Sequence, residues 1–438
     1  MILSTAFLGL SLHCAIGAAP AEGTPILSLN EALQTALSQQ PQLRQSHAFV
    51  DAASARADEA RASLLPQLTA SAIYTRRTAN FVAAPGSFPG GTSTSTTSPS
   101  WRSYNYFQFG ATASQLIWDF NFSWDRWRAA QSVAQAQYSS ELATRLQVIL
   151  AVQVSYLTAA ARRDLIQVAR DNLINQKLHL TQVEGFVRVG VRAEIDLAQA
   201  RTDEANARVQ VINAENNYQT AKAQLNQAIG IERSTSYEIG NDTVPPFADE
   251  DASVEPLLAR ALQARPEFAG VEQQVRAQQF LVKSAKGSYF PSLGISAGVT
   301  DNGRQLDQLT WNWSAQAQLQ WNLFQGFLTD STVQEANATL IGLQAQRDLL
   351  RQQVRLEIEQ ARLSLRGAKE TLSAAGEALE NALIRLKLAQ RRYQTGVGSA
   401  IELGDAQVAA TSAAAQEVGA RYNVAIARAQ LLKALGDS

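Results

Sequence analysis

Cysteine is almost absent from this 438-residue chain, in which Cys14 is the single thiol. One cysteine forms no intramolecular disulfide, and a thiolate metal site takes several cysteines. Histidine is nearly as scarce, because only His47 and His179 follow the first segment. An isolated imidazole makes neither a metal site nor a proton relay. We therefore expect no metal, no cofactor and surface positions for both histidines.

An excess of either charge is also missing, since 38 basic and 39 acidic residues give a net charge of -1. Nucleic-acid binding needs a concentrated basic surface, so we expect no nucleic-acid partner. We find no run of about 20 apolar residues after the first segment and expect no membrane-spanning helix. Residence in a membrane would then require a closed β-barrel, which pairs every backbone polar group.

Residues 1–21 have the pattern of a secretory signal peptide. An apolar stretch from Ile2 to Leu12 is followed by small residues that end in Ala19-Pro20-Ala21. No Lys or Arg precedes the apolar stretch, which departs from the usual pattern. Because His13 precedes Cys14 where a lipoprotein signal has a small residue, we expect export without lipidation.

The rest of the chain contains two copies of one plan. The first opens LNEALQTALSQQPQL from Leu29, and the second opens VEPLLARALQARPEF from Val254. Near the start of the copies, matching residues are 225 positions apart, as Pro41 and Pro266 (266 − 41) and Pro66 and Pro291 show. Further along the chain they are 206 positions apart, as Gly190 and Gly396 (396 − 190) and Gly230 and Gly436 show. The offset falls once because the first copy has about 19 extra residues in a surface loop at 82–101.

Each copy should fold as helix, strand, strand, very long helix and shorter helix. The first copy, 22–230, is predicted to have helices at about 28–64, 121–187 and 193–230 and strands at about 67–82 and 104–118. After a linker at 231–253, the second copy, 254–438, is predicted to have helices at about 254–287, 327–393 and 400–435 and strands at about 290–301 and 309–323.

The predicted strands have one apolar and one polar face. Apolar and polar residues alternate from Trp311 to Leu323, the pattern of a half-buried strand. All seven tryptophans fall in or beside the strands. Because indole rings prefer the headgroup region, we assign five to the membrane interface: Trp101, Trp118, Trp311, Trp313 and Trp321. A soluble β-sandwich with a tryptophan core is the alternative.

Four strands are too few for a membrane barrel, since the smallest known barrels have about eight. Three copies would supply a closed and even number, so a homotrimer is the simplest solution. The long helices contain no proline and would run about 100 Å at about 1.5 Å per residue. Their many alanines permit packing on both flanks, as in the wall of a tube. A soluble antiparallel coiled coil is the alternative for the helices alone.

Both long helices end at a short interruption that contains glycine. The first reads FVRVGVRAEIDLAQ from Phe186, and the second reads RYQTGVGSAIELGDAQ from Arg392. Gly190 and Gly396 stand where a helix reversal needs a left-handed residue, so both segments are predicted hairpin tips. The tips, the duplication, the paired prolines and the LIWDF and LFQGF sequences at the strand-to-helix transitions together resemble the TolC family of outer-membrane efflux proteins.

This resemblance, over about residues 27–436, implies a fold that is mainly α with a membrane β-barrel. In a homotrimer, a twelve-stranded β-barrel in the outer membrane of a Gram-negative bacterium would continue into a twelve-helix α-barrel in the periplasm. The implied function is a passive exit duct of a tripartite efflux or type I secretion system, not an enzyme. The implied partners are outer-membrane lipid, a periplasmic adaptor and, through the adaptor, an inner-membrane pump.

The resemblance also assigns residues at the tips. Family tips contact the adaptor through a VGxR-like stretch, matched by Val189, Gly190, Val191 and Arg192 in the first copy and by Thr395, Gly396 and Val397 in the second. An arginine frequent at the next family position is absent here, because Gly398 stands there.

A periplasmic gate is implied as well, formed by Asp196, Tyr393, Glu402 and Asp405. Three copies of a carboxylate at a constriction form a ring that attracts cations. The same acids also suit the first turn of any helix, where its dipole favours negative charge. A periplasmic coiled-coil scaffold or adaptor without a pore is the alternative function. An enzyme is not indicated, since no nucleophile, base and orienting group recur at useful spacing.

Overall fold

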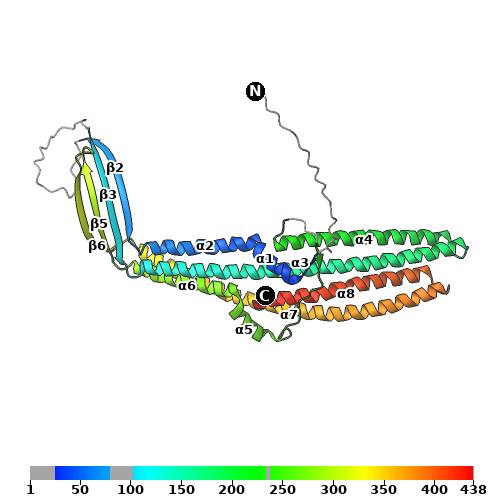
Figure 1. The fold of residues 1–438 in the computed structure, drawn as a ribbon. Coiled ribbons are helices and arrows are strands. Elements are labelled where there is room, and N and C mark those ends of the chain that lie inside the picture. The colour runs from blue at the N-terminus through cyan, green and yellow to red at the C-terminus, as the bar shows by residue number, and fades with distance from the viewer. Residues whose placement is uncertain (1–24, 79–100, 102, 233–236, 438) are drawn as a thin grey trace, which may run out of the picture. The chain divides into compact units, whose positions relative to one another are not determined.

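The computed structural model describes residues 25–78, 101, 103–232 and 237–437 (Figure 1). The predicted signal peptide and the end of the first predicted strand, 79–82, lie outside the described residues. The described elements repeat in the same order in both copies, apart from two short strands, β1 (Ile26–Leu27) and β4 (Glu238–Ile239). These two strands pair in parallel with each other, and β4 falls in the predicted linker at 231–253.

Matching helices have equal lengths in the two copies. The pairs are α1 (Leu29–Gln39) with α5 (Val254–Ala264), α2 (Pro41–Ala62) with α6 (Pro266–Gly287), α3 (Phe122–Arg188) with α7 (Leu328–Gln394), and α4 (Glu194–Ile229) with α8 (Ala400–Leu435). α3 and α7 each have 67 residues, and α4 and α8 each have 36. The duplication read from the glycine and proline spacing therefore extends to every helix.

The prediction of single helices over 28–64 and 254–287 is wrong, because each is divided in two. The break falls at Gln40 in the first copy and at Arg265 in the second, both with extended backbone (ψ 118° and 121°). Each of these residues precedes a proline, whose ring disfavours helical geometry in the residue before it. Pro41 and Pro266 instead begin the next helix, where the missing N–H leaves no bond unmade.

Four strands form one antiparallel sheet in the order β2-β3-β5-β6. They are β2 (Gln67–Thr78), β3 (Ser103–Trp118), β5 (Ser292–Gly303) and β6 (Thr310–Gln320). β3 pairs with β5 in continuous register from Phe107 to Leu116, so the two copies are joined at the centre of the sheet. Among the described residues, β2 and β6 each pair along one edge only.

The chain divides into two compact units that differ from the two sequence copies. Among the described residues, one unit comprises 25–40, 148–232, 237–250 and 363–430, and the other comprises 41–78, 101, 103–147, 251–362 and 431–437. The first contains both helix tips, and the second contains the four-stranded sheet. Each unit takes segments from both copies because α3 and α7 belong partly to each.

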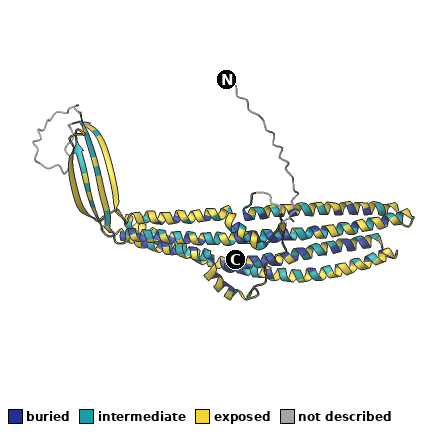
Figure 2. Ribbon diagram, in the orientation of Figure 1, coloured by how far each residue is buried: buried dark blue, intermediate teal, exposed yellow. Residues whose placement is uncertain are grey.

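The helices bury only part of their surface, as the mixed colours along them in Figure 2 show. Fully buried large side chains such as Tyr156, Leu225 and Ile358 are interspersed with exposed residues. α3 contains an 18-residue window with a mean hydropathy of 1.3, of which 39% is buried. By length and composition alone α3 could cross a membrane, a test that buried helices of soluble proteins also pass, so the expectation of no membrane-spanning helix stays a prediction.

Glycine is required where α4 and α8 end. Gly230 and Gly436 have φ values of +85° and +87°, a left-handed conformation that other residues rarely adopt. A Cβ atom on Gly230 would lie 2.9 Å from the Cα atom of Gln40, and one on Gly436 would lie 2.9 Å from the carbonyl carbon of Ala264. The end of each 36-residue helix therefore packs against backbone at the break between the first two helices of its own copy.

Candidate functional site

The two helix tips have the same backbone geometry. Gly190 and Gly396 have φ values of +75° and +78°. The N–H of the following residue donates back to the helix in both tips, from Val191 to Phe186 O (2.9 Å) and from Val397 to Arg392 O (3.0 Å). These bonds cap the last carbonyls of α3 and α7, as in the usual glycine-terminated helix end. Two equivalent sharp reversals result.

Apolar side chains at both tips are exposed. They are Val189, Val191 and Ile195 in the first tip and Val397 and Ile401 in the second, with exposed fractions of 68–76%. Exposed apolar side chains that cluster at one place mark a contact surface more often than an ordinary solvated end. The predicted tip residues Thr395 and Arg192 lie in the same two turns, so the structure places all seven predicted tip residues on the reversals themselves.

Tyr393 is the exception to this exposure, since only 2% of it is accessible. It packs with Ala389, Leu403 and Ala406 in a small cluster between α7 and α8. The Arg192 guanidinium carbon lies 4.9 Å from the centre of the Tyr393 ring, and the arginine also lies 4.0 Å from an Asp196 carboxylate oxygen. Burial raises the pKa of the Tyr393 hydroxyl, which is neutral at ordinary pH.

The arrangement around Tyr393 joins the two copies. Arg192 comes from the first tip and occupies the position that matches Gly398 in the second (398 − 192 = 206). A Cβ atom on Gly398 would lie 2.9 Å from the Tyr393 backbone nitrogen, so this turn has no room for a side chain. An arginine therefore reaches the tyrosine from the first copy instead of the second.

The three predicted gate acids differ in their surroundings. Asp196 lies near Arg192, and a carboxylate oxygen of Glu402 forms an ion pair with the Nε atom of Arg392 at 3.2 Å. Asp405 is exposed and, within the described part of the chain, has no ion pair within 4.0 Å. Its charge is therefore the least compensated of the three.

A groove of about 910 Å³ lies in the first unit, with walls from α3, α4, α7 and α8. Asp196, Tyr393 and Asp405 line this groove together with amide side chains such as Gln176 and Gln407. The Nε2 atom of Gln176 donates to Oε1 of Gln407 at 3.1 Å, and both side chains are buried. The predicted gate residues thus line one cavity of mixed polarity, except Glu402, which is outside its lining.

The prediction that both histidines are surface residues is wrong for His179. Its ring meets that of Tyr393 edge to face at 5.3 Å, and its Nδ1 atom is buried without a hydrogen-bond partner among the described residues. Burial lowers the pKa of His179, although nearby Asp203 and Asp196 oppose this shift. The prediction failed because Tyr393 lies more than 200 residues away in the sequence. His47, by contrast, is exposed beside Glu141 at 3.2 Å.

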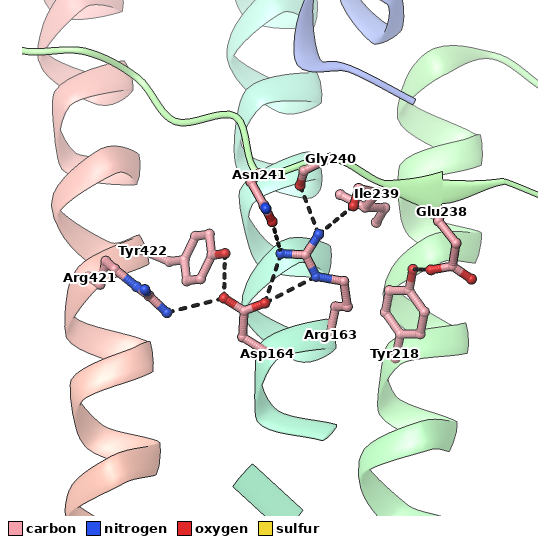
Figure 3. Close-up of polar contacts among 9 residues, drawn as sticks. All are labelled: Arg163, Asp164, Tyr218, Glu238, Ile239, Gly240, Asn241, Arg421 and Tyr422. Atoms are coloured by element: carbon pink, nitrogen blue, oxygen red, sulfur yellow. Dashed lines mark hydrogen bonds and ion pairs between the residues drawn. The ribbon is translucent and has the colours of Figure 1, made fainter. Parts of the chain in front are cut away.

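Sequence reasoning missed a polar cluster that fastens the linker to the helices (Figure 3). Arg163 of α3 donates to the carbonyl oxygens of Ile239 and Gly240 and to Oδ1 of Asn241. The adjacent Asp164 accepts from the Tyr422 hydroxyl of α8 at 2.7 Å. Because these partners are distant in sequence and form no local motif, only the fold reveals the cluster.

A second cluster holds the other end of the same linker. Glu250 lies 2.6 Å from the Lys369 ammonium of α7 and 3.0 Å from Nε of Arg428 of α8. Burial disfavours the charged carboxylate, but the two cations hold the pKa of Glu250 below its ordinary value. The linker is therefore attached to helices of both copies.

The five tryptophans assigned to the membrane interface are all exposed, with accessible fractions from 53% to 98%. Trp311 and Trp313 lie in β6, Trp118 ends β3, and Trp101 and Trp321 flank strands. No group of three or more His, Cys, Asp or Glu residues suited to a metal ion occurs within the described residues. The interface assignment stays a prediction.

Comparison with known proteins gives consistent similarities. Residues 32–231 and 257–437 match the family model described as outer membrane efflux protein. The outer membrane protein TolC of Escherichia coli is 24% identical, over 93% of this chain and 82% of its own. A toluene efflux pump outer membrane protein of Pseudomonas putida is also 24% identical, over 93% and 83%. The CmeC outer membrane channel of Campylobacter jejuni has a TM-score of 0.79 at 20% identity, over 99% and 93%. This structural likeness confirms the predicted fold class.

The surroundings of His179 predict a pH-dependent tip. Because its pKa is lowered in the folded chain, the neutral ring stabilises the packing above the ordinary pKa of 6.5. This contribution is lost as the pH falls through the lowered pKa. We expect backbone hydrogen exchange near 176–183 and 393–407, corrected for intrinsic rates, to increase on acidification.

The His179→Gln variant should lack this acid-induced step, whereas the exposed His47→Gln should retain it. An identical pH dependence in wild type and His179→Gln would contradict the role of the ring.

Proposed function

The chain belongs to the outer membrane efflux protein family, and from this premise we propose that three copies form its functional unit. It is an outer-membrane efflux channel with a long periplasmic portion. In the proposed trimer, the strands of three copies close one membrane barrel, and their long helices form one tube. Cargo passes through this duct without any chemical step.

The unpaired strand edges carry this proposal. β2 and β6 end the four-stranded sheet, and their outer edges have no partner among the described residues. In hydrocarbon, each unpaired backbone N–H or C=O group costs several kcal/mol of free energy, about as much as an unpaired polar group buried in a protein interior. Pairing β2 of one copy with β6 of the next satisfies both edges, and a threefold rotation closes twelve strands into a cylinder.

The helices support the same assembly. Leu349, Leu356 and Leu363 of α7 recur at seven-residue intervals and are 51–63% exposed in the single chain. A heptad of leucines on a long helix is the pattern that packs against another helix. Burying these side chains requires a neighbour outside the described chain, which a second copy provides.

The helix tips are the proposed contact with a periplasmic adaptor and, through it, with an inner-membrane pump. The exposed Val189, Val191 and Val397 supply the apolar surface that such contacts use. The relatives point the same way, since the Pseudomonas protein is named as the outer membrane protein of an efflux pump.

Replacing Gly190 by valine should weaken cross-linking to the adaptor, because a β-branched residue is strained at a φ of +75° and distorts the reversal. Gly185→Val is the matched control, since Gly185 lies inside α3 and has open space around its Cα. The tip assignment fails if cross-linking in cells is undiminished by Gly190→Val.

Asp405 is the proposed selectivity residue. In planar-bilayer recordings the purified protein should conduct and prefer cations, and Asp405→Asn should reduce that preference because three uncompensated charges are lost. Glu402→Gln should have a smaller effect, since Arg392 already neutralises Glu402. Absence of conductance in wild type would refute the duct, and equal selectivity in wild type and Asp405→Asn would refute this gate.

A further inference from the structure

The start of α3 and the end of α6 meet beside the four-stranded sheet. The Ser284 hydroxyl donates to Phe122 O at 2.8 Å, and a Cβ atom on Gly287 would lie 3.0 Å from Phe120 O. Only a few residues separate these helix ends from the strands, because β3 ends at Trp118 and β5 begins at Ser292. This junction therefore lies a fixed, short distance from the helix-side ends of strands β3 and β5.

Four exposed cations lie on these two helix ends, and we call them the α3–α6 collar: Arg126, Arg128, Lys283 and Lys286. The acids in the same turns are used internally. Asp119 accepts from the Ser123 backbone N–H at 2.8 Å and caps α3. Asp125 is only 6% exposed, and burial raises the pKa of its carboxyl even though Lys283 and Arg128 are near. The exposed surface of the collar is thus positive.

Aromatic rings hold three of the collar cations in place. Arg128 and Lys283 both lie 5.4 Å from the centre of the Phe280 ring, and Arg126 lies 5.3 Å from that of Phe122. Two cations beside one ring repel each other, and the single Asp125 carboxyl near them balances at most one of the two charges.

The junction also has the aromatic composition of a bilayer interface. Trp118, Trp124 and Phe290 are 43–53% exposed, and the Phe120 and Phe290 rings stack at 4.7 Å. The amphipathic rings of tryptophan and tyrosine gather at the headgroup level of membranes. The hydrocarbon core is about 30 Å thick within a bilayer of about 40–45 Å, so headgroups occupy about 5–7.5 Å in each leaflet. Lys283 is four residues from the end of α6, about 6 Å along the helix.

We propose that the α3–α6 collar binds the phosphate of an anionic phospholipid in the leaflet that faces the helices. This inference rests on the proposed function for its placement of the strands in the outer membrane. Arg128 and Lys283 hold the phosphate between them, Arg126 and Lys286 add to the positive field, and the exposed rings lie among the glycerol and upper acyl groups. The collar would fix the depth of the channel in the bilayer.

Native mass spectrometry of the detergent-solubilised protein tests the proposal, with phosphatidylglycerol and phosphatidylcholine as probes. Wild type should bind phosphatidylglycerol more tightly, and Arg128→Gln with Lys283→Gln should weaken that binding by about tenfold or more. The matched control is Arg145→Gln with Arg276→Gln, two exposed cations on the same helices farther from the strands, and it should bind as wild type does. The charge-preserving pair Arg128→Lys with Lys283→Arg should retain binding.

Equal binding of the two lipids, unchanged phosphatidylglycerol binding in the glutamine pair, or equal weakening in the control pair would each overturn the proposal. Loss of the trimer in the glutamine pair, with the charge-preserving pair intact, would also overturn it, because the cations would then serve subunit contacts. Bilayer conductance of the same samples tests the channel separately, since lipid binding in detergent does not require conduction.

Discussion

A strand edge in hydrocarbon has no water to satisfy its N–H and C=O groups, and this constraint governs the whole chain. β2 and β6 leave two such edges on a sheet that is too small to close on itself. Identical copies that pair edge to edge remove the unsatisfied groups without any further chain. The duplication within one subunit also reduces the number of free edges, because β3 of the first repeat pairs with β5 of the second at the sheet centre.

In the proposed trimer, the helices form a wall instead of a globule. A helix in the wall of a tube has water on two sides, so its contacts with neighbouring helices are narrow and partly polar. Polar contacts indeed connect α3 to α8, from Asp164 with Tyr422 to Gln176 with Gln407. Such hydrogen bonds hold the α3–α4 hairpin to the α7–α8 hairpin within one subunit. The linker clusters around Arg163 and Glu250 also bind these helices near the middle of α3 and α7.

Repetition made most of the fold predictable, since proline and glycine spacing indicated where each long helix and each tip would fall. Local chemistry gave the tips correctly, because Gly190 and Gly396 mark helix ends by their own conformational freedom. The break before Pro41 was missed although its cause is local. The burial of His179 and the contacts of Arg163 were unpredictable for another reason. Their partners are remote in the sequence, and one sequence by itself has no signal for such contacts.

Closure between copies is tested most directly by cross-linking the two edges. Ser71 of β2 and Ser314 of β6 lie on the same face of the sheet by strand alternation, and a chain carrying cysteine at both positions can be treated with a flexible bis-maleimide. The trimer account predicts dimers and trimers on a denaturing gel from the double variant, and no trimers from either single variant. Monomers alone from a correctly inserted double variant would contradict it.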